Sequence, residues 1–337
     1  MATINDIAKE LGISKSTVSK ALNNATDISA ETKNKILETA LRLGYTNKHI
    51  RDRKNKICIL IENMEYTHPN HFGYDIIEGF KELATKDGWL VEVVPIDKEF
   101  QRGMTYGVFM MQNDYAASFI LGMSLIDPWI ASFSANKIPT VMYDNFISGN
   151  PFVASVSCDS REGIDEAIHY LKDLGHTKIG LLTGPLESYV QKTRYYAYLD
   201  ALSKYNLEIN EDYIGMDYYV EDSTKNHVKR MYDLGVTAIL CTHDIRAISA
   251  IEECKNNGIR VPQDMSIVGF DDIPIAEKTD PPLTTIRQDR LAIGKAGYYA
   301  ISCFKNNIPM NQIMLYTPLI IRESTGKPTN ISKDTFN

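Results

Sequence analysis

Two short amphipathic patterns, separated by a glycine, lie within the stretch Thr3-Ile-Asn-Asp-Ile-Ala-Lys-Glu-Leu-Gly-Ile-Ser-Lys-Ser-Thr-Val-Ser-Lys-Ala-Leu-Asn23. From Ile4 to Leu11 the apolar residues recur at the spacing of one helical face. Thr3 stands where the N-cap of this helix belongs, and Gly12 ends the pattern. Ser14 then occupies the capping position of a second helix. The stretch therefore predicts two short helices joined by a tight turn.

The second helix is predicted to have two chemically different faces. One face is apolar, with Val18, Ala21 and Leu22, and the other is small, polar and basic, with Ser16, Ser19, Lys20 and Asn23. The major groove of DNA admits a helix, and Lys or Asn side chains can reach base edges or phosphates there. A helical hairpin with a merely solvated face is the alternative, which the length of the pattern disfavours. We therefore interpret residues 3–23 as a helix-turn-helix.

A third helix is predicted to close the core of this head. Ser29 is placed to cap it, and an apolar stripe runs to about Leu43 before Gly44 ends the helix. We assign residues 1–46 to a DNA-binding domain. The next segment, residues 47–56, is almost wholly polar and strongly basic. It is either a solvated linker or a hinge that lies on DNA, and the sequence supports both interpretations equally.

Positive charge is concentrated at the amino-terminal end of the chain. Residues 1–56 hold 11 Lys and Arg against 6 Asp and Glu, whereas the remaining residues hold 25 against 37. A basic head on an acidic body suits a polyanionic partner at one end only. The five cysteines are scattered and never form Cys-x-x-Cys, and the sequence has no signal-peptide or membrane-span pattern. We therefore expect a cytoplasmic protein with free thiols and no membrane association.

The chain changes character after residue 56. Short apolar, strand-like runs lie at 57–61, 90–94, 119–121, 140–143, 178–182, 238–241 and 266–270, and amphipathic helical stretches between them include 74–87, 161–174, 194–205 and 245–256. This alternation predicts an α/β fold with parallel sheets covered by helices on both faces. The pattern divides near residue 158, so we expect two doubly wound lobes. Ligands of such sheets bind beyond the carboxyl ends of the strands.

The head together with this body resembles the lactose/galactose repressor (LacI/GalR) family of bacterial transcription regulators. In the head the resemblance rests on Thr3-Ile-Asn-Asp-Ile-Ala8, Ser16-Thr-Val-Ser-Lys-Ala-Leu-Asn23 and Leu43-Gly-Tyr45. In the body it rests on Leu174-Gly-His-Thr-Lys-Ile-Gly180, Gly184-Pro185, Arg260-Val-Pro-Gln-Asp-Met-Ser-Ile-Val-Gly-Phe-Asp-Asp272, Pro282-Leu-Thr-Thr-Ile-Arg-Gln288 and Leu319-Ile-Ile-Arg-Glu-Ser324. Taken together, the order and spacing of these motifs are specific for the family, and the resemblance covers essentially the whole chain.

The resemblance implies an architecture for residues 57–337. It implies an effector-binding domain of two lobes of the periplasmic-binding-protein type, related to periplasmic sugar receptors. The chain would cross between the lobes three times, near residues 158, 288 and 317. One lobe would then comprise 57–158 with 289–317, and the other 159–288 with 318–331. The family also implies a homodimer that binds a pseudo-palindromic operator.

The segment after the head departs from the family pattern. Members usually follow the tyrosine with Pro-Asn and an Ala-Arg-x-Leu segment, a hinge helix whose leucine wedges into the minor groove. In this sequence Asn47 replaces the proline, Arg51 the alanine and Lys54 the leucine. An ammonium group cannot act as the apolar wedge that unstacks a base step. The usual kink at the operator centre, and signalling through such a hinge, are therefore in question for this chain.

Candidate DNA-contacting residues come from the head and the basic segment. We include Thr3, Lys15, Ser16, Thr17, Ser19, Lys20, Asn23, Arg51, Arg53 and Lys54. Lys20 and Ser16 are expected to face bases. Lys15, near the start of the second helix, is expected to lie nearer phosphate.

Candidate effector-binding residues follow from the resemblance, aligned without gaps from Pro185. They are Phe72, Asp144, Arg194, Tyr218, His243, Asp271 and Gln288. Arg194 matches the arginine that grips ligand in the family, and Asp271 and Asp144 match a pocket aspartate in each lobe. A guanidinium and carboxylates make paired hydrogen bonds to vicinal hydroxyls, and aromatic rings cover the apolar side of a sugar. The implied effector is a sugar; a purine or an organic acid is the alternative.

Other classes of function are weighed against this interpretation. The sequence contains no nucleophile, acid–base or phosphate-loop motif, so we expect neither an enzyme nor a cofactor. His68-Pro-Asn-His71 offers two histidines without an evident third ligand and is typical of a turn, so no metal is expected. The leading hypothesis is a repressor controlled by a small ligand. The rival hypothesis is a sugar-binding receptor whose head has lost specific DNA binding.

Overall fold

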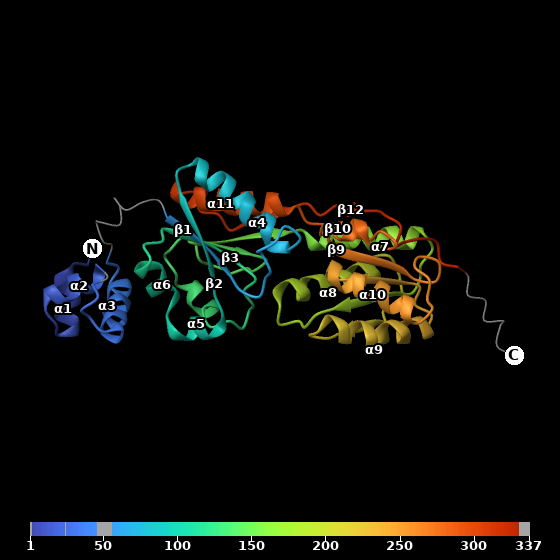
Figure 1. The fold of residues 1–337 in the computed structure, drawn as a ribbon, viewed down its shortest axis with the longest axis horizontal. Helices are drawn as coiled ribbons and strands as arrows, with labels where there is room; N and C mark the ends of the chain where they lie inside the picture. Colours follow the sequence, from blue (N-terminus) through green and yellow to red (C-terminus); the bar gives the residue numbers. More distant parts are fainter. Residues whose placement is uncertain (1, 24, 46–55, 330–337) are drawn as a thin grey trace. The chain divides into compact units, whose positions relative to one another are not determined.

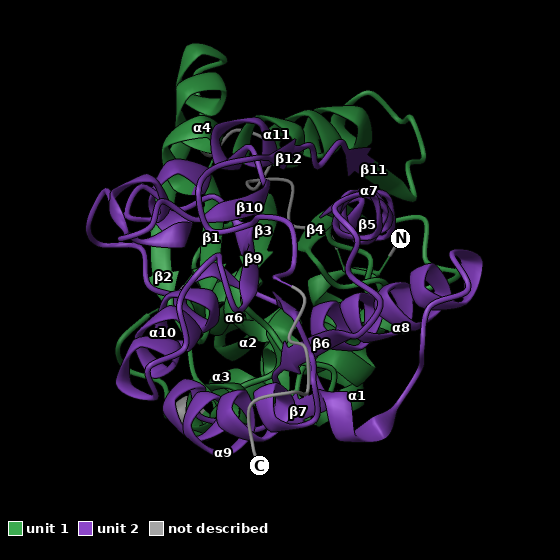
Figure 2. Cartoon of the chain, turned by 90° about the vertical axis from the view of Figure 1, so that its right-hand side faces the viewer, with its two compact units in different colours: residues 1–64, 77–156, 294–313 green, residues 65–76, 157–293, 314–337 purple. Residues whose placement is uncertain are grey.

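The computed structural model describes residues 2–23, 25–45 and 56–329. It divides into two compact units, which Figure 2 draws in green and purple. Unit 1 comprises Met1–Met64, Ile77–Val156 and Gly294–Ile313, and unit 2 comprises Glu65–Ile76, Ser157–Ile293 and Met314–Asn337. No helix within the described ranges is both long and apolar enough to cross a membrane.

Three helices form the head within unit 1: α1 (Ile4–Leu11), α2 (Lys15–Leu22) and α3 (Ala30–Arg42) (Figure 1). The caps are those that the sequence predicts. The hydroxyls of Thr3, Ser14 and Ser29 each accept the backbone N–H three residues further on. Gly12 ends α1 in the left-handed conformation, with φ of 65°.

The head has its own small apolar core. Buried side chains from all three helices meet there, namely Ile7, Ala8, Val18, Ala21, Ile36 and Ala40. Ile7, Val18 and Ile36 are completely buried. Burying such a side chain contributes roughly 1.5–3 kcal/mol, so the amphipathic stripes seen in the sequence are what hold the three helices together.

A mainly parallel sheet of six strands forms the centre of unit 1, in the order β11-β5-β4-β3-β1-β2. Its strands are β1 (Lys56–Ile61), β2 (Leu90–Pro95), β3 (Ala117–Leu121), β4 (Thr140–Tyr143), β5 (Val153–Cys158) and β11 (Gln312–Leu315). Strands β2, β1, β3, β4 and β5 pair in parallel. Their carboxyl ends therefore lie along one edge of the sheet.

Helices pack on unit 1's sheet through aromatic contacts. The helices are α4 (Phe72–Lys86), α5 (Lys98–Gly103), α6 (Tyr106–Gln112) and α11 (Arg290–Lys305), with a short 3-10 helix, η2 (Ile130–Ser134). Phe80 of α4 stacks on Phe119 of β3 with ring centroids 5.4 Å apart, and Tyr298 of α11 meets Phe80 edge-on. A Cβ at Gly297 would lie 2.8 Å from the Phe119 ring, so this glycine lets α11 approach the sheet closely.

Unit 2 is built around a second sheet of six strands, in the order β12-β10-β9-β8-β6-β7. Its strands are β6 (Ile179–Thr183), β7 (Ile214–Met216), β8 (Ala238–Cys241), β9 (Ser266–Asp271), β10 (Thr284–Arg287) and β12 (Leu319–Ile320). Strands β7, β6, β8, β9 and β10 pair in parallel, and β12 pairs with β10 in the antiparallel direction. The carboxyl ends of β6–β10 again share one edge.

Two helical layers cover the faces of this second sheet. Helices α7 (Ser160–Asp173) and α8 (Tyr189–Lys204) pack together on one face, and α9 (Val220–Asp233) and α10 (Asp244–Asn256) pack together on the other. Side chains of β8 alternate between the two layers: Ala238 and Leu240 join the α7–α8 core, whereas Ile239 and Cys241 join the α9–α10 core. The remaining short helices are η3 (Glu211–Tyr213) and η4 (Ala276–Lys278).

The predicted α/β class, with its helix-turn-helix head and two doubly wound lobes, is confirmed. Elements that the sequence pattern did not reveal are short or interrupted by polar residues. They include β5, β7, β10, β11, β12, α5, α6 and α9. Strand β7 has three residues, and β10 is rich in threonine. Neither gives the run of apolar residues on which the strand assignment depended.

Candidate functional site

The recognition face of the head is presented by α2. Lys15, Ser16, Lys20 and Asn23 are exposed, while Val18 and Ala21 turn into the head core. The structure thus separates the two faces as the sequence predicts. Helix α2 is eight residues long and is capped by Ser14 at its N-terminus, the end from which a helix of this motif contacts base edges.

Several candidate DNA-contacting side chains are already bonded within the head. The Lys20 ammonium donates to the Asp27 carboxylate at 2.5 Å, and Asn23 donates through its amide to the Ser19 carbonyl at 2.8 Å. Thr3 and Asp6 form a capping box, and the Thr17 hydroxyl lies 2.8 Å from that of Ser14. Arg51, Arg53 and Lys54 lie outside the described residues.

A second candidate site lies along the carboxyl edge of unit 2's sheet. Arg194, from the second turn of α8 rather than its first residue, is 3% exposed. Its guanidinium lies over the Phe270 ring, 3.6 Å from the ring centroid, and donates to the Thr242 carbonyl. One terminal nitrogen lies 3.6 Å from an Asp271 carboxylate oxygen. The structure therefore brings Arg194 and Asp271 together, as the resemblance implied.

Asp271 sits in a backbone conformation that side chains rarely adopt. Its φ is 116°, and that of Asp272 is 51°. The two carboxylates have different partners: Gln288 donates to Asp271 at 2.6 Å, whereas Arg287 and Arg322 donate to Asp272 at 2.6 and 2.7 Å. Asp272 thus stabilises the fold through its two arginine partners. Asp271 lies beside Arg194 at the carboxyl edge of the sheet. Backbone strain of this kind concentrates at functional positions.

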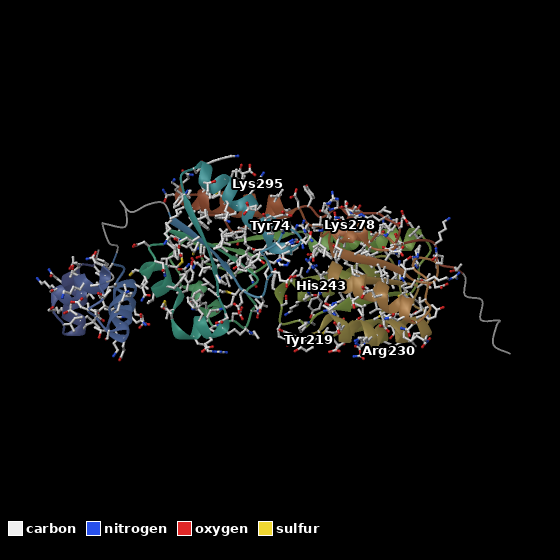
Figure 3. The ribbon with its side chains drawn as sticks, viewed as in Figure 1. Tyr74, Tyr219, Arg230, His243, Lys278 and Lys295 are labelled. Carbon is white, nitrogen blue, oxygen red and sulfur yellow. The ribbon has the colours of Figure 1, made fainter. Side chains whose placement is uncertain are left out.

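His243 stands directly before α10 and acts as its N-cap (Figure 3). Its Nδ1 accepts the Arg246 backbone N–H at 3.1 Å, so the other ring nitrogen is the one that carries hydrogen in the neutral ring. Burial, with the Arg246 and Arg194 charges nearby, lowers the pKa of His243 to about 3. The imidazole is therefore a neutral hydrogen-bond donor at physiological pH.

Arg246 is a residue of this edge that the sequence analysis missed. It lies in the first turn of α10 and is 2% exposed. Its guanidinium donates to the Ser223 hydroxyl and, at 3.4 Å, to the Asp217 carbonyl. A cation is unfavourable at a helix N-terminus, which is the signal that could have marked this arginine as held there by something else.

Asp244 is a buried residue that links segments at the carboxyl edge of the same sheet. It is completely buried, and its carboxylate accepts from the Thr285 hydroxyl at 2.6 Å and the Ile273 backbone N–H at 2.8 Å. Burial, together with the Asp271 charge, raises the pKa of Asp244 well above its ordinary value. A Cβ at Gly269 would lie 2.2 Å from the Asp244 carboxylate, so only glycine fits there in β9.

The other predicted effector-binding residues are placed as follows. Tyr218, just beyond β7, is 75% exposed and meets Tyr219 edge-on, with ring centroids 5.1 Å apart. Phe72 begins α4. Asp144 belongs to unit 1, directly follows β4 and has a positive φ of 53°. Their part in effector binding stays a prediction.

Unit 1 contributes a buried carboxyl cluster at the carboxyl end of β1, which the sequence analysis also missed. Glu62 is 3% exposed and accepts from the Gln101 amide at 2.5 Å. Asp127 is 4% exposed and lies 3.5 Å from the Lys98 ammonium. Burial, with the Asp127 charge nearby, raises the pKa of Glu62 to about 7. A glutamate directly after an apolar strand was the available signal.

Two family models match this chain. Residues 3–48 match the model described as bacterial regulatory proteins, lacI family. Residues 168–325 match the periplasmic binding protein-like domain. The first match covers the head with its recognition helix, and the second contains every residue of the unit 2 edge described above.

Curated relatives match over most of their length. The HTH-type transcriptional repressor CytR of Escherichia coli (strain K12) is 28% identical over 302 residues, which is 87% of each chain. The HTH-type transcriptional repressor PurR of Aliivibrio salmonicida (strain LFI1238) is 29% identical over 299 residues, or 88% of this chain and 90% of the relative. Both relatives are repressors by name.

Solved structures share the fold. A transcriptional regulator CelR–cellobiose complex superposes with a TM-score of 0.70 at 22% identity, covering 96% of this chain and all of the other. The lac repressor dimer bound to operator and the anti-inducer ONPF gives a TM-score of 0.67 at 22% identity, covering 96% and 99%.

The lacI-type head and the periplasmic-binding-protein-like body together define a ligand-responsive, DNA-binding regulator. The head matches the lacI family of bacterial regulatory proteins over residues 3–48, and the body matches the periplasmic binding protein-like domain over residues 168–325, as the resemblance indicated.

Proposed function

We propose that the protein is a cytoplasmic transcriptional repressor that binds a pseudo-palindromic operator as a homodimer and is controlled by a small ligand, a sugar. The proposal depends on two features of the same chain. Helix α2 has an exposed face of small polar and basic side chains, and the unit 2 sheet has a buried arginine beside an aspartate at its carboxyl edge. The first feature fits a DNA groove, and the second fits a polar small molecule.

Charge supports the DNA half of this proposal. The excess of Lys and Arg in residues 1–56 would neutralise backbone phosphates, which supplies sequence-independent affinity. The exposed polar side chains of α2 would then read base edges. An eight-residue helix reads only a few base pairs, so two copies bound to two half-sites give the specificity that one copy lacks.

The effector half is supported by the chemistry of the unit 2 edge. Arg194 and the neutral His243 offer donors, and Asp271 offers acceptors. His243 follows β8, Asp271 ends β9, and the guanidinium of Arg194 reaches the ends of both strands. Such a set can bond paired hydroxyls of a sugar. The effector can change DNA affinity only through different contacts in two conformations of the protein.

The test is selection of binding sequences by the full-length protein from a random duplex library. We expect enrichment of an inverted repeat, and two chains bound per selected duplex in analytical ultracentrifugation. Affinity for the selected duplex should fall steeply with salt. Enrichment of no sequence, or of a single half-site bound by one chain, would contradict the proposal, and the first result would favour the receptor whose head has lost specific DNA binding.

A further inference from the structure

Two buried guanidinium groups lie on the carboxyl edge of the unit 2 sheet. Arg194 is 3% exposed and Arg246 is 2% exposed. Arg194 reaches the Thr242 carbonyl beyond β8 and the Phe270 ring of β9. Arg246 reaches the loops beyond β6 and β7: a Cβ built on Gly184 would lie 3.6 Å from its Nη2 atom, which also donates to the Asp217 carbonyl. Both charges therefore lie at the loops where a parallel sheet presents ligands.

Neither guanidinium has a close carboxylate partner among the described residues. Arg246 donates to a hydroxyl and a carbonyl, and the Asp217 carboxylate instead contacts His227 at 2.9 Å. Arg194 lies 3.6 Å from Asp271, which is longer than a charge-assisted hydrogen bond. Within the described part of the chain, the Nε atoms of both arginines are buried and have no hydrogen-bond partner.

The remaining charged groups of this edge leave the two guanidiniums under-compensated. Burial lowers the pKa of His243 to about 3, and the Asp244 carboxylate is already bonded to the Thr285 hydroxyl and the Ile273 backbone N–H. Asp272 is occupied by Arg287 and Arg322. Asp271 lies 3.6 Å from Arg194, and the carboxylate whose charge acts on Arg246 is Asp217, which is bonded to His227. A buried charge that lacks a counter-charge is costly unless a bound group supplies one.

We propose that the effector carries an anionic group, a phosphate ester or a carboxylate, which Arg246 and Arg194 bind together from unit 2. The planar fork of a guanidinium matches both kinds of anion. A neutral sugar would satisfy hydrogen bonds but would leave the charge uncompensated. The inference rests on the proposed function for the statement that the bound anion is the regulatory effector, and it narrows that effector to an acidic sugar derivative.

The test compares matched charged and neutral compounds on the full-length protein. Thermal shift at constant ionic strength screens hexoses and pentoses against their phosphate esters and their uronic and aldonic acids, with inorganic phosphate as the minimal anion. The affinity of each compound that stabilises the protein is then measured by calorimetry. We expect a charged compound to bind about tenfold or more tightly than its neutral parent. Comparison of the phosphate esters with the uronic and aldonic acids shows whether the bound anionic group is a phosphate or a carboxylate.

Variants locate the binding group. Arg246→Gln should weaken the charged compound about tenfold or more beyond any weakening of the neutral parent. Arg246→Lys should retain part of the discrimination. The matched control is Arg260→Gln, which removes an exposed arginine paired with Asp264 and should change neither affinity. Far-ultraviolet circular dichroism confirms that each variant is folded, and the charged-against-neutral comparison on the unaltered protein needs no variant.

Two results would overturn the inference. One is a neutral compound that binds as tightly as its charged derivatives. The other is the absence of stabilisation by inorganic phosphate and by every charged compound. The DNA selection separates this failure from failure of the proposed function, because anion binding is measured without DNA. If the protein binds the anion but selects no duplex, the anion site is supported and the proposed role as a transcription regulator is contradicted.

Discussion

The Lys20 ammonium lies 2.5 Å from the Asp27 carboxylate, joining the recognition helix α2 to the turn before α3. The two side chains are 52% and 57% exposed. The hydrogen bond from Lys20 holds the pKa of Asp27 below its usual range. Lys20 is thus oriented within the head before any partner arrives, and a base edge or phosphate must compete with Asp27 for the ammonium group.

Lys20→Ala should relax base preference at one position of each half-site. Lys20 lies on the exposed face of α2, so it is expected to contact a base, and its removal should reduce discrimination at that position about tenfold. Lys15→Ala is the matched change at the start of the helix and should weaken all sequences alike, because Lys15 is expected to contact phosphate. Selection from a duplex library measures both.

Asp27→Asn should have the opposite effect on DNA affinity from Lys20→Ala. It removes the competing carboxylate, so affinity for the selected duplex should rise and its dependence on salt should steepen. An unchanged base preference in Lys20→Ala would show that the assigned face of α2 is wrong.

The basic segment, residues 47–56, is expected to contribute charge rather than a wedge. Neutralising Arg51, Arg53 and Lys54 together should flatten the logarithmic salt dependence by about 0.9 for each phosphate that these side chains neutralise in the unaltered protein. Bending of the operator, measured by energy transfer between labelled duplex ends, should stay the same. A complex in which Ile50 inserts between the central base pairs would refute this prediction.

The fold could be predicted from the sequence where local chemistry sets the structure. Thr3, Ser14 and Ser29 are caps because their hydroxyls satisfy nearby backbone N–H groups, and such bonds depend only on short-range spacing. Long apolar strands such as β1 were identified for the same reason. Strand β7, with three residues, forms because its neighbours pair with it, and pairing partners are not visible in a local pattern.

The candidate site could be predicted only where the resemblance supplied positions. Arg194 and Asp271 meet as expected, although 77 positions separate them in the numbering of the chain. Arg246 and Asp244 were missed because their roles come from burial beneath loops that belong to other strands. Glu62 directly follows an apolar strand, but the partners that make its carboxyl group unusual, Gln101 and Asp127, come from segments far along the chain.

Protonation of Glu62 should make stability depend on pH. Its pKa is raised from 4.5 to about 7 by burial and by Asp127, while Gln101 and Lys98 act in the other direction. Between these values the native state holds a proton that the unfolded chain has released. The contribution of Glu62 to the free energy of unfolding therefore falls as pH rises through this range, whereas that of His243, whose pKa is lowered to about 3, rises with pH up to its ordinary value of 6.5. Urea denaturation of the unaltered protein and of Glu62→Gln at pH 5 and pH 8 measures the Glu62 contribution.

Glu62→Gln should reduce that fall, because the amide can fill the same space without ionising. Glu78→Gln, a change at a 48% exposed carboxyl group on α4, is the control and should keep the pH dependence of the unaltered protein. Equal pH dependence in both variants would show that Glu62 does not retain its proton in the native state.

Arg194→Ala should abolish the effector-dependent change in DNA affinity while leaving effector-free DNA binding intact. Arg194 is buried against Phe270 and Asp271, far along the chain from the head, so the substitution removes a ligand-binding group without altering α2. Removing the guanidinium also leaves a desolvated polar group of the ligand without its donor, which weakens effector binding about tenfold or more. Calorimetry with the effector found by screening, and DNA titration with and without it, are the measurements.

Arg161 is an ordinary surface arginine and provides the matched control for Arg194. It is 64% exposed and paired with Asp200, and an exposed pair of this kind contributes roughly 0–1 kcal/mol. Arg161→Ala should therefore leave both effector affinity and the DNA response unchanged. Asp271→Ala should behave like Arg194→Ala, because the two side chains share one edge and one hydrogen-bonding task. If effector affinity were unchanged in both Arg194→Ala and Asp271→Ala, the effector would bind elsewhere on the protein and the assignment of this edge would be wrong.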